Sequence, residues 1–271
     1  MTLRLNTKAS RAIHHVKMSA RHILKARFWR GHGVHSPYVY RLVRHVISVN
    51  DIPGASRAEA YRKAVLSSSR PLQKSSFGAT ADSGASTTLG RMARSNGASR
   101  SEGYLLARLA ADLKPASILE LGTSTGLSTA HLAAACPDAL VVSLEGDEQI
   151  AAAARENLAS HGFSNVNVLT GNIDDTLSDA IALLPDSRVA FAFIDANHTF
   201  EATLRYFNVL IDNAAPHAIL VFDDIYWSKP MTSAWHAIVA DPRVKTSIEL
   251  NGVGIAIVRQ GCQKEHFLLR N

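Results

Sequence analysis

The sequence predicts an α/β fold in which a doubly wound, mostly parallel sheet ends in an antiparallel hairpin. Three observations lead to this fold class. From residue 101 onward, short apolar runs alternate with segments of helical periodicity, which is typical of strands and helices wound around one parallel sheet. A glycine-containing turn follows the first of these runs, and Asn251-Gly252 alone separates the last two.

Five apolar runs are expected to form the parallel strands. Val, Ile, Leu and Phe follow one another in them with little polar alternation, which indicates strands that are buried on both faces. The strands are expected at residues 117–122, 140–145, 165–169, 189–195 and 218–223, and the helices at 126–136, 147–160, 174–184, 199–213 and 231–240. A helix between successive strands supplies the crossover connection that parallel pairing needs.

The last two runs, 245–250 and 253–259, are expected to pair as a hairpin. Asn and Gly both tolerate the positive φ of a two-residue turn, so Asn251-Gly252 between apolar runs is a strong hairpin signal. A closing hairpin distinguishes this layout from a nucleotide-binding fold that ends in another parallel strand.

Residues 1–100 differ from the rest of the chain in charge and in pattern. They contain 18 Lys and Arg but only 3 Asp and Glu, a net +15, whereas residues 101–271 have a net charge of −9. We therefore expect a basic helical extension over 1–100 and a second domain over 101–271. Apolar positions from Ile13 to Phe28 recur at helical spacing, a second helix is expected at 37–49, and the Ser- and Gly-rich residues 67–100 are expected as a loop or lid.

Composition limits the compartment and the class of protein. The mean hydropathy is +0.01, and no apolar run approaches the ~20 residues that are needed to cross a bilayer. The two cysteines, Cys136 and Cys262, show no metal-type spacing. A disulfide framework is therefore not expected, and the reducing cytoplasm fits best, with peripheral attachment to a membrane as the alternative.

The turn Gly122-Thr123-Ser124-Thr125-Gly126 has three interpretations. Its letters satisfy G-x-S-x-G, the nucleophile elbow of α/β-hydrolases, with Asp195, His217 and His236 as later triad candidates. That elbow usually follows several strands, and none is recognisable upstream. A dinucleotide site needs G-x-G-x-x-G so that the backbone can approach a pyrophosphate. The G-x-x-x-G spacing found here suits a ligand without phosphates.

Polar residues near that turn favour the third interpretation, a ligand with an amino-acid end, a ribose and an adenine. Glu120 precedes the turn and could meet an ammonium group. Glu145 ends the next expected strand, where a carboxylate can accept hydrogen bonds from ribose hydroxyls. Gly171-Asn172 follow the third strand and would border the adenine. As alternatives, Glu145 would cap the following helix and Gly171 would be only a turn.

These residues resemble the class I S-adenosylmethionine-dependent methyltransferases, and among them the catechol-type O-methyltransferases. The resemblance covers residues 101–260 and includes ILELGTSTGLST, LEGD, FIDANH and FDDIYWSKPM. The segment RGHGVHSP, residues 30–37, resembles the leader of a bacterial subgroup of predicted O-methyltransferases. The resemblance implies a Rossmann-like, seven-stranded sheet of order 3-2-1-4-5-7-6. The cofactor contacts that we expect are Glu120, Gly122, Thr123, Ser124, Gly126, Ser128, Glu145, Gly146, Gly171, Asn172 and Asp195.

The resemblance also implies a divalent-metal site, with Mg²⁺ as the expected ion, at Asp195 and the pair Asp223-Asp224. Asp224 departs from the family's usual Asn, and His198 stands where the family has a catalytic Lys. Three carboxylates at neighbouring strand ends would repel one another unless a cation or protons intervene, and oxygen ligands suit a hard ion. We expect His198 as the base and Asp195 as a second catalytic residue. The alternative is a solvated Asp224 and a surface His198.

The expected activity is S-adenosylmethionine-dependent methylation of a hydroxyl group on a small acceptor. FIDANH stands where methyltransferases that act on amino groups carry N-P-P-[YF], which favours an oxygen nucleophile. The alternatives are a nucleic-acid or protein methyltransferase that is guided by the basic extension, and a cofactor-binding protein without catalysis.

For the basic extension three roles are open. It could cap the active site and select the acceptor, or contact an anionic membrane surface through residues 1–30, where Phe28 and Trp29 lie near Lys and Arg. Nucleic-acid binding is the least favoured role, because few aromatic residues are interleaved with the basic ones. A homodimer is a further expectation.

Overall fold

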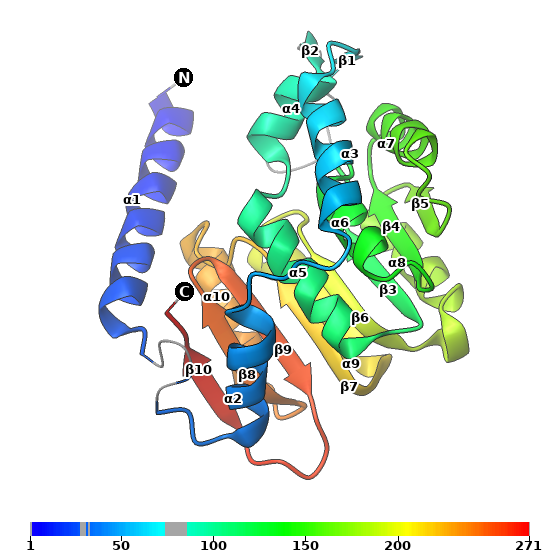
Figure 1. The fold of residues 1–271 in the computed structure, drawn as a ribbon. Helices are drawn as coiled ribbons and strands as arrows, with labels where there is room; N and C mark the ends of the chain where they lie inside the picture. The colour runs from blue at the N-terminus through cyan, green and yellow to red at the C-terminus, as the bar shows by residue number, and fades with distance from the viewer. Residues whose placement is uncertain (1, 28–30, 32, 74–85, 271) are drawn as a thin grey trace. The chain divides into compact units, whose positions relative to one another are not determined.

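The computed structural model of the chain describes residues 2–27, 31, 33–73 and 86–270 (Figure 1). Phe28, Trp29, Arg30, His32 and residues 74–85 of the expected lid lie outside the described residues. The chain packs as two compact units, the first comprising Met1–Ser48 with Phe193–Asn271 and the second Val49–Ala192. The functional division at residue 100 stays a prediction.

The predicted fold class is confirmed as α/β, with a mostly parallel sheet and antiparallel strands near the carboxyl terminus. In the described chain the strands of the main sheet follow the order β10-β8-β9-β7-β6-β3-β4-β5. The predicted strands 1 to 7 correspond to β3 to β9, so the sheet read from β5 to β8 has the predicted order 3-2-1-4-5-7-6. The eighth strand, β10 (Glu265–Leu268), pairs in parallel with β8 (Val244–Leu250). It escaped prediction because Glu-His-Phe-Leu is too short and too polar to stand out as an apolar run.

The second unit aligns the carboxyl ends of β3 (Ser117–Leu121), β4 (Leu140–Glu145) and β5 (Val166–Thr170). In their parallel register Leu121 is the partner of Leu144, and Glu145 is the partner of Thr170. β3 is buried over its full length, as predicted for a strand covered on both faces. The helices of this unit are α3 (Ala55–Ser67), α4 (Leu89–Asn96), α5 (Arg100–Leu113), α6 (Leu127–Ala135), α7 (Glu148–Ser160) and α8 (Ile173–Ala182); a 3₁₀ turn (Pro185–Ser187) precedes β6 (Val189–Ile194).

Part of the segment that was expected to be a loop, residues 67–100, is regular structure instead. Strands β1 (Pro71–Gln73) and β2 (Ser86–Thr88) pair antiparallel, and α4 follows them directly. The Thr88 hydroxyl caps α4 by accepting a hydrogen bond from the Arg91 N–H, and Leu89, Met92 and Ala93 are buried. The loop prediction was wrong for residues 71–73 and 86–96. The Ser, Thr and Gly content concealed a short strand pair and a capped helix with apolar spacings of three and four.

His131 of α6 is buried beside α5. Only 1% of its surface is exposed, and among the described residues neither ring nitrogen has a hydrogen-bond partner. Gly103 of α5 makes room for the ring, since a Cβ at that position would lie 2.3 Å from it. Burial is the main cause that lowers the pKa of His131 from 6.5 to about 4. The charge of Glu59 raises this pKa, and the charges of Arg62 and Arg100 lower it.

We expect His131 to make the free energy of unfolding fall by about 3 kcal/mol as the pH drops from 6.5 to 4. In this window the unfolded chain binds a proton that the folded chain excludes, so acid favours unfolding. Urea unfolding at both ends of the window should show a smaller loss for His131→Leu than for the wild type. The exposed His45→Gln is the matched control. A loss in His131→Leu as large as in the wild type would contradict this account.

The first unit contains the carboxyl-terminal hairpin and the amino-terminal helices. β8 and β9 (Val253–Val258) pair antiparallel around Asn251-Gly252, where Gly252 has a φ of 95°, as the predicted turn requires. β9 pairs on its other side with β7 (Ala214–Phe222). The helices are α1 (Thr2–Lys25), α2 (Pro37–Leu42), which continues into a π-helical turn (Val43–Ile47), α9 (Phe200–Asp212) and α10 (Lys229–Ala240). Within the described ranges no helix is both long and apolar enough to cross a membrane.

Candidate active site

The loop after β3 has a positive φ at three of its five positions. Gly122 (101°), Ser124 (47°) and Gly126 (77°) turn the chain from β3 into α6, and Gly126 is the N-cap of that helix. A Cβ at Gly126 would lie 2.6 Å from the Tyr61 Oη. Glycine is therefore required at this position both by the backbone conformation and by close packing.

Backbone and side-chain groups outside the loop hold it in place. The N–H groups of Gly122 and Thr123 both donate to the Leu144 carbonyl oxygen at 3.0 Å. The Tyr61 hydroxyl of α3 donates to the Thr125 carbonyl oxygen at 2.9 Å. Tyr61 is fully buried, and burial raises the pKa of its hydroxyl far above the usual value. The hydroxyl therefore stays protonated and keeps its role as a donor.

Glu120 lies fully buried in β3. Its Oε2 accepts hydrogen bonds from Thr129 Oγ1 at 2.5 Å and from Ser143 Oγ at 2.6 Å. Ser143 Oγ in turn lies 2.5 Å from Thr123 Oγ1 in the loop. This network connects the carboxylate to α6, to β4 and to the loop. Glu120 could be identified from the sequence, but Thr129, Ser143 and Tyr61 could not, because contacts between distant elements leave no local pattern.

Glu145 ends β4 and contacts the loop through its backbone. Its Oε2 accepts the Ser124 N–H at 2.8 Å, and its Oε1 accepts the Asp147 N–H at 3.0 Å. Burial raises the pKa of Glu145, whereas these N–H groups favour the ionised carboxylate. Each carboxylate oxygen has a second lone pair, so Glu145 can accept further hydrogen bonds from a pair of hydroxyl groups.

The helix-cap alternative for Glu145 is wrong, because Asp147 has that role. The Asp147 Oδ1 accepts the N–H groups of Gln149 at 2.8 Å and Ile150 at 3.0 Å, which caps α7. Behind Glu145, Gly146 is half-buried. Its contact with a cofactor stays a prediction.

The segment after β5 has the conformation of a constrained turn. Gly171 has a φ of 144°, and its N–H donates to the Glu145 carbonyl oxygen at 2.9 Å. The Asn172 side chain caps α8 by accepting the Asp174 N–H at 3.3 Å. Ser128 is buried in α6. Contacts of Gly171 and Asn172 with an adenine, and of Ser128 with a cofactor, stay predictions.

Asp195 and His198 lie together in the first unit, in the turn between β6 and α9. Nε2 of His198 is 3.3 Å from Oδ1 of Asp195. Asn197 and His198 have positive φ values of 60° and 45°, and this tight turn brings the ring to the carboxylate three residues before it. The Trp227 ring lies 6.1 Å from the His198 ring between centroids. A histidine that is oriented by a carboxylate has the arrangement of a general base.

Asp223 and Asp224 directly follow β7, and Asp224 has a φ of 52°. Burial raises the pKa of Asp224, His198 and His15 lower it, and Asp195 raises it. Asp195 and His198 thus both affect the pKa of Asp224, and the convergence of all three aspartates stays a prediction.

The predicted metal site requires Asp195, Asp223 and Asp224 to direct their oxygens at one point. In the part of the chain that the structure describes, no group of three or more His, Cys, Asp or Glu side chains could hold a metal ion. The Asp195 Oδ1 lies 3.3 Å from the His198 Nε2 instead. The residues do not fit the metal that the resemblance implies, so we assign no chemical step to one.

Helix α1 contacts the elements that follow these aspartates. The His14 Nε2 lies 3.0 Å from the Thr232 Oγ1 of α10, and the Arg11 guanidinium lies 5.8 Å from the centre of the Trp227 ring. His15 is among the groups that lower the pKa of Asp224. The role of the extension as a cap over the active site stays a prediction. Sequence reasoning could not locate these contacts, because more than two hundred residues separate the partners.

Comparison with known families and proteins supports the predicted resemblance. Residues 119–225 match the family model described as a methyltransferase domain, a span that contains every predicted cofactor, catalytic and metal-binding residue. This part of the chain is therefore similar to a methyltransferase domain, which favours the third interpretation of the glycine loop over the hydrolase and dinucleotide interpretations.

Among curated proteins, the chain is 32% identical over 111 residues to the O-methyltransferase imqG of Aspergillus flavus, covering 40% of this chain and 44% of that protein. It spans less than half the length of the curated relatives that it matches. Among solved structures, an O-methyltransferase from Bacillus cereus in complex with SAH has a TM-score of 0.58 at 22% identity, covering 82% of this chain and 97% of that chain. The O-methyltransferase TomG from Streptomyces achromogenes, in complex with SAM, has a TM-score of 0.54 at 22% identity, covering 82% and 95%. These structures share the fold.

Proposed function

We propose that this chain, whose residues 119–225 match the model of a methyltransferase domain, transfers the methyl group of S-adenosylmethionine to an oxygen of a small hydroxylated acceptor. One observation carries the proposal. Glu145, the last residue of β4, accepts a hydrogen bond from the Ser124 N–H, and Ser124 belongs to the loop that follows the buried Glu120 of β3. Two of the curated relatives, imqG and a protein-L-isoaspartate O-methyltransferase, carry names that support oxygen as the acceptor atom, whereas a third is a tRNA (adenine-N6)-methyltransferase.

Two residues around the loop carry groups that suit two parts of S-adenosylmethionine, its ammonium group and its ribose. The Glu120 carboxylate offers a negative charge for the ammonium group. The oxygens of Glu145 offer acceptors for the two ribose hydroxyls. The loop has no third glycine for a pyrophosphate, and S-adenosylmethionine has no phosphate.

For the acceptor we assign His198 as the base and Asp195 as the residue that orients its ring. The acceptor hydroxyl gives its proton to His198 while its oxygen bonds to the methyl carbon. The carbon–sulfur bond breaks, and S-adenosylhomocysteine leaves. A neutral imidazole can accept this proton near neutral pH, and the Asp195 carboxylate stabilises the imidazolium that forms. Alignment of the oxygen with the methyl group supplies much of the remaining rate.

The proposal is tested by transfer of labelled methyl groups from S-adenosylmethionine to a panel of hydroxylated and amino metabolites, with Mg²⁺ or with EDTA. We expect label on hydroxylated acceptors, in amounts that EDTA does not diminish. Label on amino acceptors alone would overturn the assignment of oxygen. If EDTA abolished methyl transfer and Mg²⁺ restored it, the reaction would require the metal that the resemblance implies.

We expect His198→Gln to lower kcat by about 100-fold or more, the range for loss of a general base, with little change in the affinity for S-adenosylmethionine. Glutamine keeps a polar side chain but cannot take up the proton. Steady-state kinetics and titration with S-adenosylmethionine check both expectations, with the exposed His217→Gln as control. An unchanged kcat in His198→Gln would contradict the assignment of His198 as the general base.

A further inference from the structure

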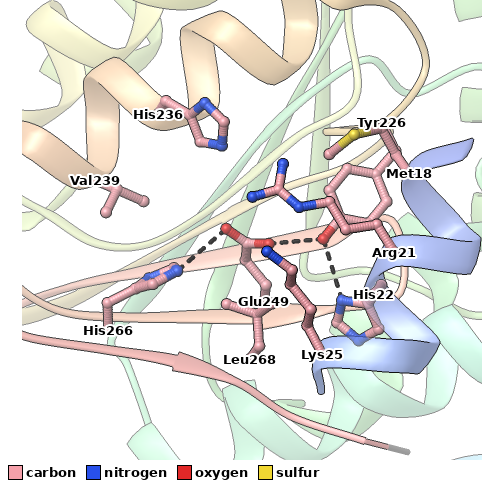
Figure 2. Close-up of a pocket in the computed structure, with 10 residues that line it drawn as sticks. All are labelled: Met18, Arg21, His22, Lys25, Tyr226, His236, Val239, Glu249, His266 and Leu268. Atoms are coloured by element: carbon pink, nitrogen blue, oxygen red, sulfur yellow. Dashed lines mark hydrogen bonds and ion pairs between the residues drawn. The ribbon is translucent and has the colours of Figure 1, made fainter. Parts of the chain in front are cut away.

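Helix α1 packs against the first unit through its polar side. His22 is buried, with its Nδ1 3.1 Å from the Tyr226 Oη and its Nε2 2.9 Å from the Leu269 carbonyl oxygen. One and two turns earlier in the helix, Met18 is buried and His14 contacts Thr232. Figure 2 shows His22 of α1 beside Tyr226, which in turn reaches Glu249. The orientation of α1 is therefore set by directional hydrogen bonds.

This orientation leaves the apolar side of α1 in solvent. The exposed fractions are 69% for Ile13, 67% for Val16, 56% for Ile23 and 85% for Leu24. These four are most of the large hydrophobic residues that are exposed in the described chain, the others being Tyr40 and Leu183. At the periodicity of an α-helix, they lie with the exposed Ala20 within an arc of about 100°. A helix that served only to cover the protein core would bury such a stripe.

Basic side chains lie directly beside this apolar stripe. Lys17, Arg21 and Lys25 are exposed and recur every fourth residue, between the apolar stripe and the packed side of the helix. Arg21 and Lys25 also line a cavity of about 370 Å³ with His236 and His266 (Figure 2). The whole of α1 contains six Lys or Arg and no Asp or Glu.

We propose that α1 docks the protein on an anionic membrane surface, with the stripe Ile13, Val16, Ala20, Ile23 and Leu24 entering the boundary between headgroups and acyl chains. An exposed apolar face next to Lys and Arg is the arrangement of helices that lie in the plane of a bilayer. A second copy of the chain is a poorer occupant, since two identical stripes in contact would bring Lys17, Arg21 and Lys25 of both copies together. The apolar stripe has no counterpart on a nucleic-acid backbone.

The test is co-sedimentation of the full chain with vesicles of phosphatidylcholine alone and of phosphatidylcholine with phosphatidylglycerol. The wild type should bind the mixed vesicles, less strongly as salt is added, and should bind neutral vesicles weakly. The variant Lys17→Gln/Arg21→Gln/Lys25→Gln should bind on the order of 100-fold more weakly, about fivefold for each charge. The variant Ile13→Ser/Val16→Ser/Ile23→Ser/Leu24→Ser should lose at least about tenfold in binding to the mixed vesicles.

The control variant is Tyr40→Ser/Leu183→Ser, which removes the exposed apolar residues outside α1 and should bind like the wild type. Circular dichroism and thermal melting check that each variant is folded, which the exposure of the stripe leads us to expect. Absence of binding by the wild type would overturn the proposal, as would equal binding by the stripe variant. A dimer in light scattering that the stripe variant abolishes, without vesicle binding, would assign the stripe to a second copy instead. Co-sedimentation measures binding without methyl transfer, so its outcome does not depend on the proposed enzymatic activity.

Discussion

Replacing Glu145 by alanine is expected to weaken the binding of S-adenosylmethionine by about 100-fold or more, because two hydrogen bonds to a charged acceptor contribute about 1.5–3 kcal/mol each. The same change removes the acceptor of the Ser124 and Asp147 N–H groups, so the loop also loses a contact that orders it. Isothermal titration of the folded variant with S-adenosylmethionine measures the effect. Because burial raises the pKa of Glu145, affinity in the wild type should decline toward acid pH.

The matched control is Glu148→Ala, which removes an exposed carboxylate in the first turn of α7. Its affinity should equal that of the wild type. Glu145→Gln should fall between the wild type and the alanine variant, since the amide retains one acceptor oxygen but no charge. Wild-type affinity in Glu145→Ala would contradict the assignment of this carboxylate to the ribose.

The largest expected effect on stability comes from Glu249. This buried carboxylate accepts hydrogen bonds from the Tyr226 hydroxyl at 2.6 Å and the Trp235 Nε1–H at 2.8 Å, and His266 Nε2 lies 3.3 Å away. Glu249→Ala should lower the free energy of unfolding by about 3–5 kcal/mol, the range for removal of one partner from a buried charged network. The variant leaves Tyr226 and Trp235 without their acceptor and weakens the packing of α1 through His22. Thermal and urea unfolding measure the loss.

The pH dependence of this effect has a definite sign. Burial opposes ionisation of Glu249, but the hydrogen bonds from His266, Tyr226 and Trp235 outweigh it and lower the pKa from 4.5 to about 2. The stabilisation is therefore complete above pH 4.5 and is lost as the pH falls toward 2. The difference in stability between the wild type and Glu249→Gln should shrink over that interval. Exposed Glu201→Gln is the control, and a difference that did not change with pH would contradict the ionised network.

The parallel strands and the hairpin could be predicted because their signals are local. Uninterrupted apolar runs, and Asn251-Gly252 between the last two of them, correspond to elements that the structure places within a few residues of the expected bounds. β10 and α4 could not be predicted in this way. The first is a short edge strand that depends on pairing with β8, and the second is a capped helix within a polar segment.

The site shows the same division between local and distant information. Glu120, Glu145 and the glycine loop could be located because they lie at the carboxyl ends of strands, where α/β sheets bind ligands. Their partners Tyr61 and Ser143 come from other elements and needed the structure. The side of α1 that packs against the protein also needed the structure, because an amphipathic pattern does not tell which face is covered.

The central claim, that this chain binds S-adenosylmethionine at the loop after β3, is tested most directly by equilibrium titration of the wild-type chain with that compound. We expect saturable binding at one site per chain, with S-adenosylhomocysteine as a competitor. A folded protein that showed no binding of either compound would contradict this claim.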